Sequence, residues 1–288
     1  MKLVTNDYGC GTSSSIVDYG IEDVVIVSPD NYGHIFDMND DLFFVGHDFL
    51  AYIWDTDEKV KRLQEYPHAK IVWCFEKIDA IVTQWREKSH YSMSMIVQFA
   101  DDIYSCDEDD CNKYSYKWLP QWASRRFYDK RDEARELHKD KMLFSGQAGK
   151  PEYFIRNKLL YDIFNHPVLS QKLNITNHSR SFSWDDYIDN FLSHKLILNP
   201  VGVISALNVR AYEGLFAGKV VLQQEISHYK RHRHLLDKFE NIHFFKTFDE
   251  LESIFKNTSF DKLVVNPEVA FNENSLYARM KSIGVEIK

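Results

Sequence analysis

The chain has 288 residues, of which 44% are hydrophobic and 27% charged, and its formal net charge is −8. This length accommodates one large domain or two lobes of roughly 130 residues each. An acidic chain lacks the electrostatic signature of proteins that bind a phosphate polymer, so we expect no nucleic-acid partner. We also expect no membrane span and no secretory signal, because the sequence contains no apolar window of about 18 residues and turns polar soon after its start.

Aromatic residues make up 15% of the chain, which suits a well-filled core and leaves rings for stacking on flat ligands. The four cysteines include no CxxC pair, which indicates reduced thiols and a cytoplasmic location. A zinc site at Cys106 and Cys111 is an alternative, but their spacing does not match that of known zinc ligands.

The first half of the sequence alternates short β-branched or aromatic runs with segments of other character. Strands are predicted at residues 1–5, 24–28, 42–45, 70–75, 103–105 and 118–119, and a helix at about 79–99. A polar stretch follows at 124–141, in which basic and acidic residues are interleaved without a sustained apolar face. We interpret this stretch as the connection between two lobes.

The second half repeats the alternation. Strands are predicted at 142–144, 174–176, 196–198, 220–223 and 242–245, and helices at 153–169, 184–192, 208–217, 248–255 and 276–283. In the first of these helices, Phe154, Leu159, Leu160 and Ile163 recur near helical spacing. Ser183 suits the N-cap of the second helix, and Gly218 closes the third.

This order of elements predicts an α/β protein made of two Rossmann-like lobes that face a cleft. We place the lobes at residues 1–125 and 140–270 and expect a C-terminal helix in 271–288. Ligands of open α/β sheets bind beyond the carboxyl ends of the strands, so the loops that follow the strands are the candidate site.

The loop from Ser145 to Lys150 leads from a predicted strand into a helix. Its glycines, Gly146 and Gly149, would let backbone N–H groups approach a phosphate, and the N-terminus of the helix adds a favourable field. The loop is not a P-loop, because the G-x-x-x-x-G-K-S/T pattern is absent. An ordinary strand-to-helix turn is the alternative.

A second loop runs from Asn199 to a helix that begins near Asn208. Arg210 and Glu213 lie three residues apart, on one face of the first turn of that helix. A carboxylate there can accept hydrogen bonds from both hydroxyls of a ribose, while an arginine and the helix N-terminus can counter the charge of a diphosphate. The alternative is a local Arg–Glu pair on the surface.

These segments resemble the donor-binding element of glycosyltransferases with the two-lobed GT-B fold, in particular CgeB-like and exostosin-like enzymes. The family pattern is an asparagine, an arginine, an aromatic residue and a glutamate, followed by a small-residue helix, a glycine and an apolar strand. The matching positions are Asn208, Arg210, Tyr212, Glu213, Gly218 and 220–222. Further similar pieces lie at 118–120, 144–156, 248–251 and 275–279, so the resemblance covers about residues 100–285.

The resemblance implies a donor site formed by Gly146, Arg156, Asn208, Arg210 and Glu213, with Asn199 and Gly202 near the sugar. The glutamate would hold the donor ribose, an arginine would face the diphosphate, and the glycine would let the phosphate approach. The resemblance also places the nucleotide-sugar donor in the C-terminal lobe and the acceptor on the N-terminal lobe. It also implies that the C-terminal helix packs back on the first lobe.

Many retaining enzymes of this fold carry a second glutamate eight positions before the ribose glutamate. This sequence has Ser205 there, which favours an inverting mechanism. An inverting transfer needs a general base that deprotonates the acceptor hydroxyl. The loops after strands of the first lobe offer Asp7, Asp48 and Glu76, with His47 as the next candidate, although each is also explained as a loop-capping or solvated residue.

Asp55 and Asp57 imitate the DxD motif that grips a divalent ion in the other major glycosyltransferase fold. The residues after them look helical, and aspartates are typical of helix starts, so we interpret them as capping residues. The basic run from His228 to His234 is interpreted as a solvated helix or loop. We therefore expect no metal and no cofactor other than the nucleotide-sugar co-substrate.

The sequence thus predicts a metal-independent, inverting glycosyltransferase that moves a hexosyl or pentosyl group from a UDP-linked donor to a hydroxyl of a glycan or glycoconjugate. A DNA-base glycosyltransferase is one alternative, which the net charge disfavours. A non-catalytic module that binds a nucleotide sugar is the other.

Overall fold

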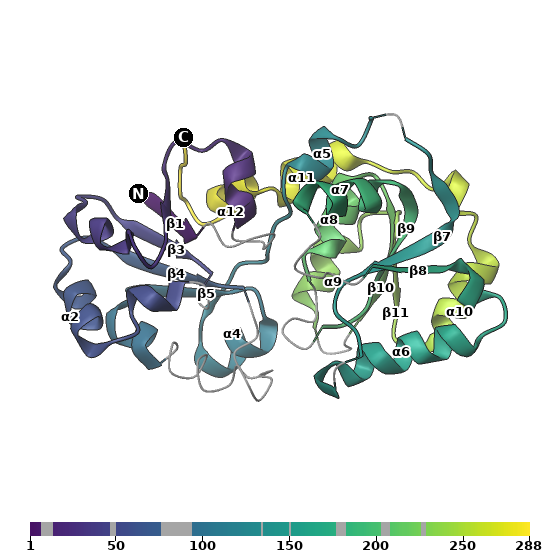
Figure 1. Cartoon of the computed structure of the whole chain (residues 1–288), viewed down its shortest axis with the longest axis horizontal. Coiled ribbons are helices and arrows are strands. Elements are labelled where there is room, and N and C mark those ends of the chain that lie inside the picture. The colour runs from purple at the N-terminus through teal and green to yellow at the C-terminus, as the bar shows by residue number, and fades with distance from the viewer. Residues whose placement is uncertain are drawn as a thin grey trace. The chain divides into compact units, whose positions relative to one another are not determined.

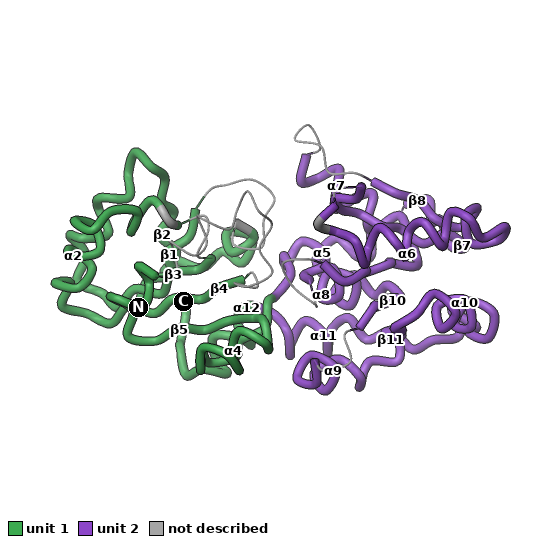
Figure 2. Tube along the Cα trace, turned by 90° about the horizontal axis from the view of Figure 1, so that it is seen from below, with its two compact units in different colours: residues 1–121, 203–205, 276–288 green, residues 122–202, 206–275 purple. Residues whose placement is uncertain are grey.

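The computed structural model describes residues 1–6, 14–46, 50–75, 94–133, 135–149, 151–176, 183–202, 208–225 and 229–288. Among these, residues of 1–121 and 276–288 form one compact unit and residues of 122–275 form a second (Figure 2). Each unit is built on its own parallel sheet with helices around it (Figure 1). This confirms the predicted α/β fold with two sheets.

The sheet of unit 1 has six strands in the order β2-β1-β3-β4-β5-β6, all parallel. They are β1 (Lys2–Asn6), β2 (Val24–Val27), β3 (Leu42–Val45), β4 (Lys70–Cys74), β5 (Asp102–Ser105) and β6 (Lys117–Trp118). The helices are η1 (Ser14–Tyr19), η2 (Tyr32–Asp37), η3 (Ala51–Ile53), α2 (Asp57–Glu65), α4 (Glu108–Tyr114) and α12 (Leu276–Ser282). Of the helix predicted at 79–99, residues 94–99 are helical and the rest lie outside the described residues.

The strands β1, β3 and β4 of unit 1 are buried on both faces. Val4, Phe44 and Val72 belong to one core cluster, while the alternate residues Phe43 and Trp73 are equally buried on the other face. Because successive strand residues point to opposite faces, a sheet covered on both sides needs continuous apolar runs, and β3 consists of one.

The end of the chain packs within unit 1. The hydroxyl of Tyr277, in α12, donates a hydrogen bond to the carbonyl oxygen of Tyr19 at 2.8 Å. The buried side chain of Arg279 donates from Nε to the carbonyl oxygen of Gln121 at 3.1 Å. These two bonds tie α12 to segments far away in the sequence.

The sheet of unit 2 has five parallel strands in the order β11-β10-β9-β7-β8. They are β7 (His138–Ser145), β8 (Leu173–Thr176), β9 (His194–Asn199), β10 (Val220–Gln224) and β11 (Ile242–Phe245). The α-helices are α5 (Arg126–Asp129), α6 (Phe154–Asn165), α7 (Trp184–Leu192), α8 (Arg210–Phe216), α9 (Arg231–Leu236), α10 (Phe248–Asn257) and α11 (Pro267–Asn274). Short 3₁₀ turns lie at η4 (Pro151–Tyr153), η5 (Leu169–Lys172) and η6 (Phe260–Lys262).

Two separate cores cover the faces of this sheet. In β10, Val220 and Leu222 pack into the core that contains side chains of α6 and α10, whereas Val221 packs into the core formed with α5, α7, α8 and α11. The helices are distributed in the same way in Figure 1. Helix α8 lies very close to the sheet at Gly214. A Cβ added to this glycine would stand only 2.4 Å from Cγ2 of Val221 in β10, so no larger residue fits without a shift.

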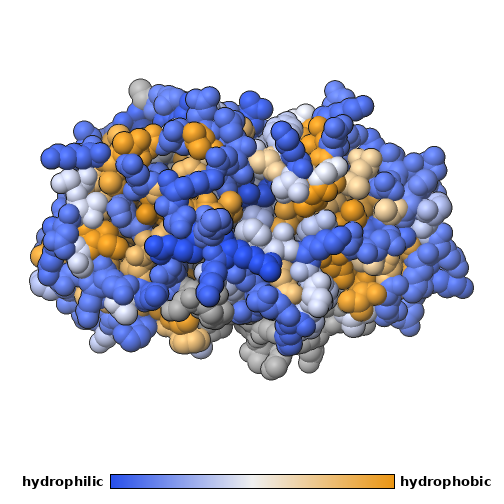
Figure 3. Space-filling model, turned by 180° about the vertical axis from the view of Figure 1, so that it is seen from behind, coloured by the Kyte–Doolittle hydropathy of each residue, from blue (hydrophilic) through white to orange (hydrophobic). Residues whose placement is uncertain are grey.

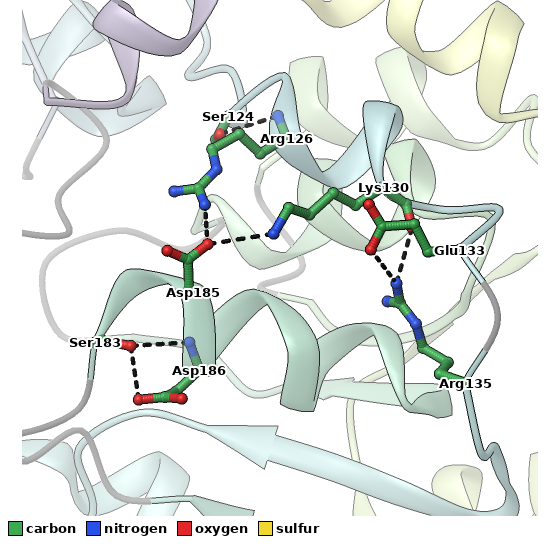
Figure 4. Close-up of polar contacts among 8 residues, drawn as sticks. All are labelled: Ser124, Arg126, Lys130, Glu133, Arg135, Ser183, Asp185 and Asp186. Atoms are coloured by element: carbon green, nitrogen blue, oxygen red, sulfur yellow. Dashed lines mark hydrogen bonds and ion pairs between the residues drawn. The ribbon is translucent and has the colours of Figure 1, made fainter.

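The polar stretch at 124–141, predicted to connect the lobes, belongs to unit 2. The ring of Phe127, in α5, is fully buried, and its centroid lies 5.0 Å from that of Phe191. Arg126 and Lys130 both form ion pairs with Asp185 in the first turn of α7, as Figure 4 shows. The ring of Tyr128 also stacks on that of Phe271, with 4.4 Å between their centroids, so two adjacent rings anchor a mostly polar segment that shows no apolar periodicity.

The predicted N-cap of α7 is confirmed. Ser183 has extended backbone angles, and its hydroxyl oxygen accepts a hydrogen bond from the backbone N–H of Asp186 at 3.0 Å (Figure 4). The cap satisfies one of the free N–H groups of the first turn.

Helix α6 is apolar on both sides. Leu159, Leu160 and Ile163 are buried in one core cluster with strand residues, but the side chain of Phe154, which the sequence spacing groups with them, is 70% exposed. At 100° per residue, Phe154 lies about 140° around the helix from Leu159, so the two cannot share one face.

The surface is mixed in character. In the view of Figure 3, apolar residues form separate patches among hydrophilic ones. Within the described part of the chain, no helix has the length and hydrophobicity that a membrane span requires.

Candidate functional site

The strand order of unit 2 reverses between β7 and β9. The chain runs outward from β7 to β8 on one side and from β9 to β10 and β11 on the other. Ser145 ends β7 and Asn199 ends β9, so the loops after these neighbouring strands leave the same edge of the sheet in opposite directions. Such a point of reversal is where open α/β sheets bind ligands.

Arg210 bridges the two strand ends. Its Nε donates a hydrogen bond to the carbonyl oxygen of Ser145, and its Nη1 lies 3.4 Å from Oδ1 of Asn199. Asn208 sets the start of α8, because its Oδ1 accepts a hydrogen bond from the backbone N–H of Arg210 at 3.2 Å. Its Nδ2 donates to the carbonyl oxygen of Pro200 at 3.3 Å. The loop residues thus fix the guanidinium of Arg210 at the reversal point.

Gly146 leaves room for that guanidinium. Its φ is +153°, and a Cβ at this position would stand 2.3 Å from Nη2 of Arg210. A side chain here would therefore displace the arginine. The sequence predicts that a phosphate approaches Gly146 closely, and in the structure the group next to this glycine is the guanidinium of Arg210.

Arg156, in the first turn of α6, supplies a second guanidinium. Its side chain is only 4% exposed, and its Nη1 donates a hydrogen bond to the carbonyl oxygen of Gln147 at 2.6 Å. The guanidinium carbon lies 4.6 Å from the ring centre of Tyr153 and 5.4 Å from that of Phe144. Burial first, and the neighbouring charge of Arg210 second, lower the pKa of Arg156 to about 9.

The two arginines concentrate positive charge that is not neutralised locally. Within the described ranges, neither guanidinium forms an ion pair with a carboxylate, and Nε of Arg156 is buried without a hydrogen-bond partner. Buried charge of this kind is costly unless an opposite charge offsets it. Planar guanidiniums with free N–H groups match the geometry of phosphate oxygens.

Glu213 lies one turn further along α8 and is nearly inaccessible, with 2% exposure. The hydroxyl of Tyr187 donates a hydrogen bond to its Oε2 at 2.5 Å. Burial raises the pKa of Glu213 to about 7, against the opposing effects of the Tyr187 hydrogen bond and the charge of Arg210. The alternative of a solvated Arg–Glu surface pair is therefore wrong: each of the two residues has its own partners.

The remaining sequence candidates divide into two groups. Asn199 is fully buried and contacts Arg210, and Gly202 is the last described residue of its loop. The four residues considered for the reaction mechanism, Asp7, Asp48, Glu76 and Ser205, lie outside the described residues, as does His47.

The Asp55–Asp57 segment starts a helix, but its capping side chain is that of Thr56 and not of either aspartate. Thr56 is the N-cap of α2, and its side chain accepts a hydrogen bond from the backbone N–H of Lys59 at 3.3 Å. The ammonium group of Lys59 binds Asp55 at 2.6 Å. In the part of the chain that the structure describes, no three His, Cys, Asp or Glu side chains are grouped so that they could hold a metal ion.

Sequence reasoning missed several residues around this site. Tyr187 contacts the candidate carboxylate of Glu213, although its position on the apolar face of α7 indicated only a core residue. At the end of β10, Gln223 accepts a buried hydrogen bond from Asn199, the last residue of β9, and Gln224 accepts one from the backbone N–H of Val201 in the loop after it. Two polar residues that end an otherwise apolar strand next to a candidate loop are the signal that could have revealed them.

A group of buried acids in unit 1 was also not predicted. Asp107, Glu108 and Asp110 follow the end of β5 and are almost inaccessible. Oδ1 of Asp107 caps α4 by accepting hydrogen bonds from the backbone N–H groups of Asp109 and Asp110, at 3.0 and 3.2 Å. Capping of α4 therefore explains why an aspartate is buried at position 107.

The two parallel α/β sheets match those of solved structures with the GT-B fold. HepE from Anabaena, solved in complex with UDP, is similar with a TM-score of 0.57 and 9% identity, and the match covers 98% of each chain. An α,α-trehalose-phosphate synthase (UDP-forming) from Burkholderia vietnamiensis is similar with a TM-score of 0.55 and 7% identity, over 93% of this chain and 81% of that chain. The α,α-trehalose 6-phosphate synthase from Burkholderia multivorans is similar with a TM-score of 0.53 and 10% identity, over 89% of this chain and 69% of that chain. No family model and no curated protein matches the sequence.

Proposed function

We propose that this protein is a glycosyltransferase. It moves a sugar from a nucleoside diphosphate donor, a UDP-sugar, to a hydroxyl of a glycan or glycoconjugate. The transfer proceeds with inversion and without a metal ion or cofactor. The finer resemblance to CgeB-like and exostosin-like enzymes stays a prediction. We also propose a cytoplasmic location, because the four cysteines of the sequence include no CxxC pair.

The observation that carries this proposal is the pair of uncompensated guanidiniums at the reversal point of the second sheet. A diphosphate at this point would receive hydrogen bonds from Arg210 and Arg156, and both charges would then be offset. In a glycosyl transfer the diphosphate is the leaving group, so the same two charges would stabilise it as the bond to the sugar breaks.

Glu213 supports a nucleotide rather than a simple phosphate. A carboxylate one turn beyond Arg210 has the spacing to accept hydrogen bonds from ribose hydroxyls while the arginine contacts the diphosphate. Tyr187 holds one carboxylate oxygen in place. UDP is favoured over other nucleotides because HepE was solved with UDP and the trehalose-phosphate synthase is UDP-forming.

Replacing Glu213 with alanine should weaken UDP binding by about 1–3 kcal/mol, because hydrogen bonds between the carboxylate and the ribose are lost. Calorimetric titration with UDP measures this directly. As a control, Glu252→Ala removes a carboxylate of the same unit that pairs with Lys256 and should leave the affinity unchanged. An unchanged affinity in a folded Glu213→Ala protein contradicts the ribose assignment.

The affinity for a UDP-sugar should rise with pH through the neutral range. Because the pKa of Glu213 is raised to about 7, its carboxyl carries a proton at pH 6 and has one acceptor oxygen fewer for the ribose. A UDP-sugar is the appropriate ligand, since it lacks the terminal phosphomonoester, whose second pKa is near 6. Titrations from pH 6 to pH 8 should show that UDP-sugar affinity rises with pH in wild type and stays constant in Glu213→Gln. The same dependence of affinity on pH in both proteins would contradict a role for the Glu213 carboxylate.

Activity should survive EDTA. The guanidiniums of Arg156 and Arg210 provide the positive charge that a divalent ion provides elsewhere, so removal of metal should leave turnover within about twofold. The measurement is release of UDP from a panel of UDP-sugars with and without EDTA. Complete loss that manganese restores would contradict metal independence. UDP binding without any donor turnover across the panel would favour a non-catalytic binding module.

A further inference from the structure

A chain of buried amides connects the end of β10 to Arg210. Gln223 and Asn199 are paired residues of the neighbouring strands β10 and β9, and both are essentially inaccessible. Nε2 of Gln223 donates a hydrogen bond to the carbonyl oxygen of Gln224 at 2.5 Å. Oε1 of Gln223 accepts one from Nδ2 of Asn199 at 2.6 Å, and Oδ1 of Asn199 faces Nη1 of Arg210 at 3.4 Å.

The polarity of this chain is fixed at both ends. A backbone carbonyl only accepts hydrogen bonds, so Gln223 must turn its NH₂ group toward Gln224 and its oxygen toward Asn199. Asn199 must then donate a hydrogen bond from its own NH₂ group to this oxygen, so the oxygen of Asn199 points toward Arg210. A guanidinium only donates, so this is the one orientation in which every contact is satisfied.

Without Gln223, only the contact with Arg210 would hold the orientation of the Asn199 side-chain amide. In the rotated orientation its NH₂ group would face the guanidinium of Arg210, donor against donor. Arg210 would then lose one of its two anchors and be left with the carbonyl oxygen of Ser145 alone. A guanidinium that is free to move away from the end of β7 binds an anion there less well.

We propose that Gln223 is a positioning residue: through Asn199 it holds the guanidinium of Arg210 at the reversal point and thereby sets the affinity for the diphosphate part of the donor. The identity of the ligand in this statement rests on the proposed function. The orientation of Arg210 does not, because it is a property of the protein without ligand.

The first test compares UDP with uridine in Gln223→Met, which keeps the size of the side chain but removes both of its hydrogen bonds. UDP affinity should fall about tenfold, as expected for a lost hydrogen bond to a charged group. Uridine affinity should stay the same, because uridine carries no phosphate. A loss shared equally by both ligands would show a merely structural role and overturn the proposal.

Two further variants separate positioning from packing. In an Asn199→Ala background, Gln223→Met should cause no further loss of UDP affinity, and additive losses would overturn the proposal. Gln223→Glu is the conservative variant: a buried glutamate opposite a carbonyl oxygen takes up a proton, donates it to Gln224 and still accepts from Asn199. It should retain wild-type UDP affinity within about threefold, and it keeps the test decisive if the methionine variant does not fold.

Crystal structures without ligand test the inference independently of the proposed function. In Gln223→Met, the guanidinium of Arg210 should leave Asn199, whereas in Gln223→Glu it should stay. An unmoved Arg210 in the methionine variant overturns the proposal. If wild type binds neither UDP nor uridine, the proposed function fails, and the two structures still decide whether Gln223 positions Arg210.

Discussion

Replacing Arg210 with methionine is expected to weaken UDP binding by about 3–5 kcal/mol, roughly 10²–10⁴-fold, because two charge-assisted hydrogen bonds to the diphosphate are lost together. The change also leaves Asn199 and the carbonyl oxygen of Ser145 without their donor. Arg210→Lys should recover only part of the loss, since an ammonium group cannot bridge two strand ends and a phosphate in one plane. Calorimetric titration with UDP and with uridine provides the measurement, and uridine binding should change little.

Arg125→Met is the matched control for this substitution. Arg125 belongs to the same unit, is solvent-exposed and pairs with Asp129 within its own turn. Its removal should leave UDP affinity as in wild type. If Arg210→Met is folded and binds UDP as tightly as this control, then the diphosphate does not bind at the reversal point of the second sheet.

The second large effect concerns the catalytic base. One of the substitutions Asp7→Asn, Asp48→Asn and Glu76→Gln should lower turnover by about 10²–10⁴-fold while UDP affinity stays nearly intact. These residues lie outside the described part of the chain, but their place in the sequence relative to the strands is informative. Asp7 directly follows β1, and Asp48 comes shortly after β3. β1 and β3 are the paired neighbours between which the strand order of the first sheet reverses.

The stereochemical outcome is measured separately. Proton NMR of the fresh product should show a β-linkage from an α-linked donor, because a base-assisted single displacement inverts the anomeric carbon. An α-linked product would contradict inversion. Normal turnover in all three base variants would contradict the choice of base even if inversion holds, and His47 would then be the next residue to replace.

The local structure of this protein could largely be predicted from its sequence. The apolar runs of β3 and β11 were predicted with their observed bounds, as was α7 together with its Ser183 cap. Caps and periodicity depend on residues within a turn or two of each other, so they leave a signal in the sequence itself. The alternation of strands and helices then implied parallel sheets, and the structure contains two.

The sequence also predicted which residues bind a nucleotide: Arg210 and Glu213 from their place on one face of a helix start after a strand, and Arg156 from the family resemblance alone. Only the tertiary structure decided what each of them contacts. Arg210 meets a carbonyl oxygen 65 positions earlier in the chain, and Glu213 meets a tyrosine 26 positions earlier. Such contacts depend on the order of strands in the sheet, which places β9 beside β7 and thereby brings Asn199 and Ser145 to one edge. Local patterns carry no information about that order, since it is set by how whole elements pack against one another.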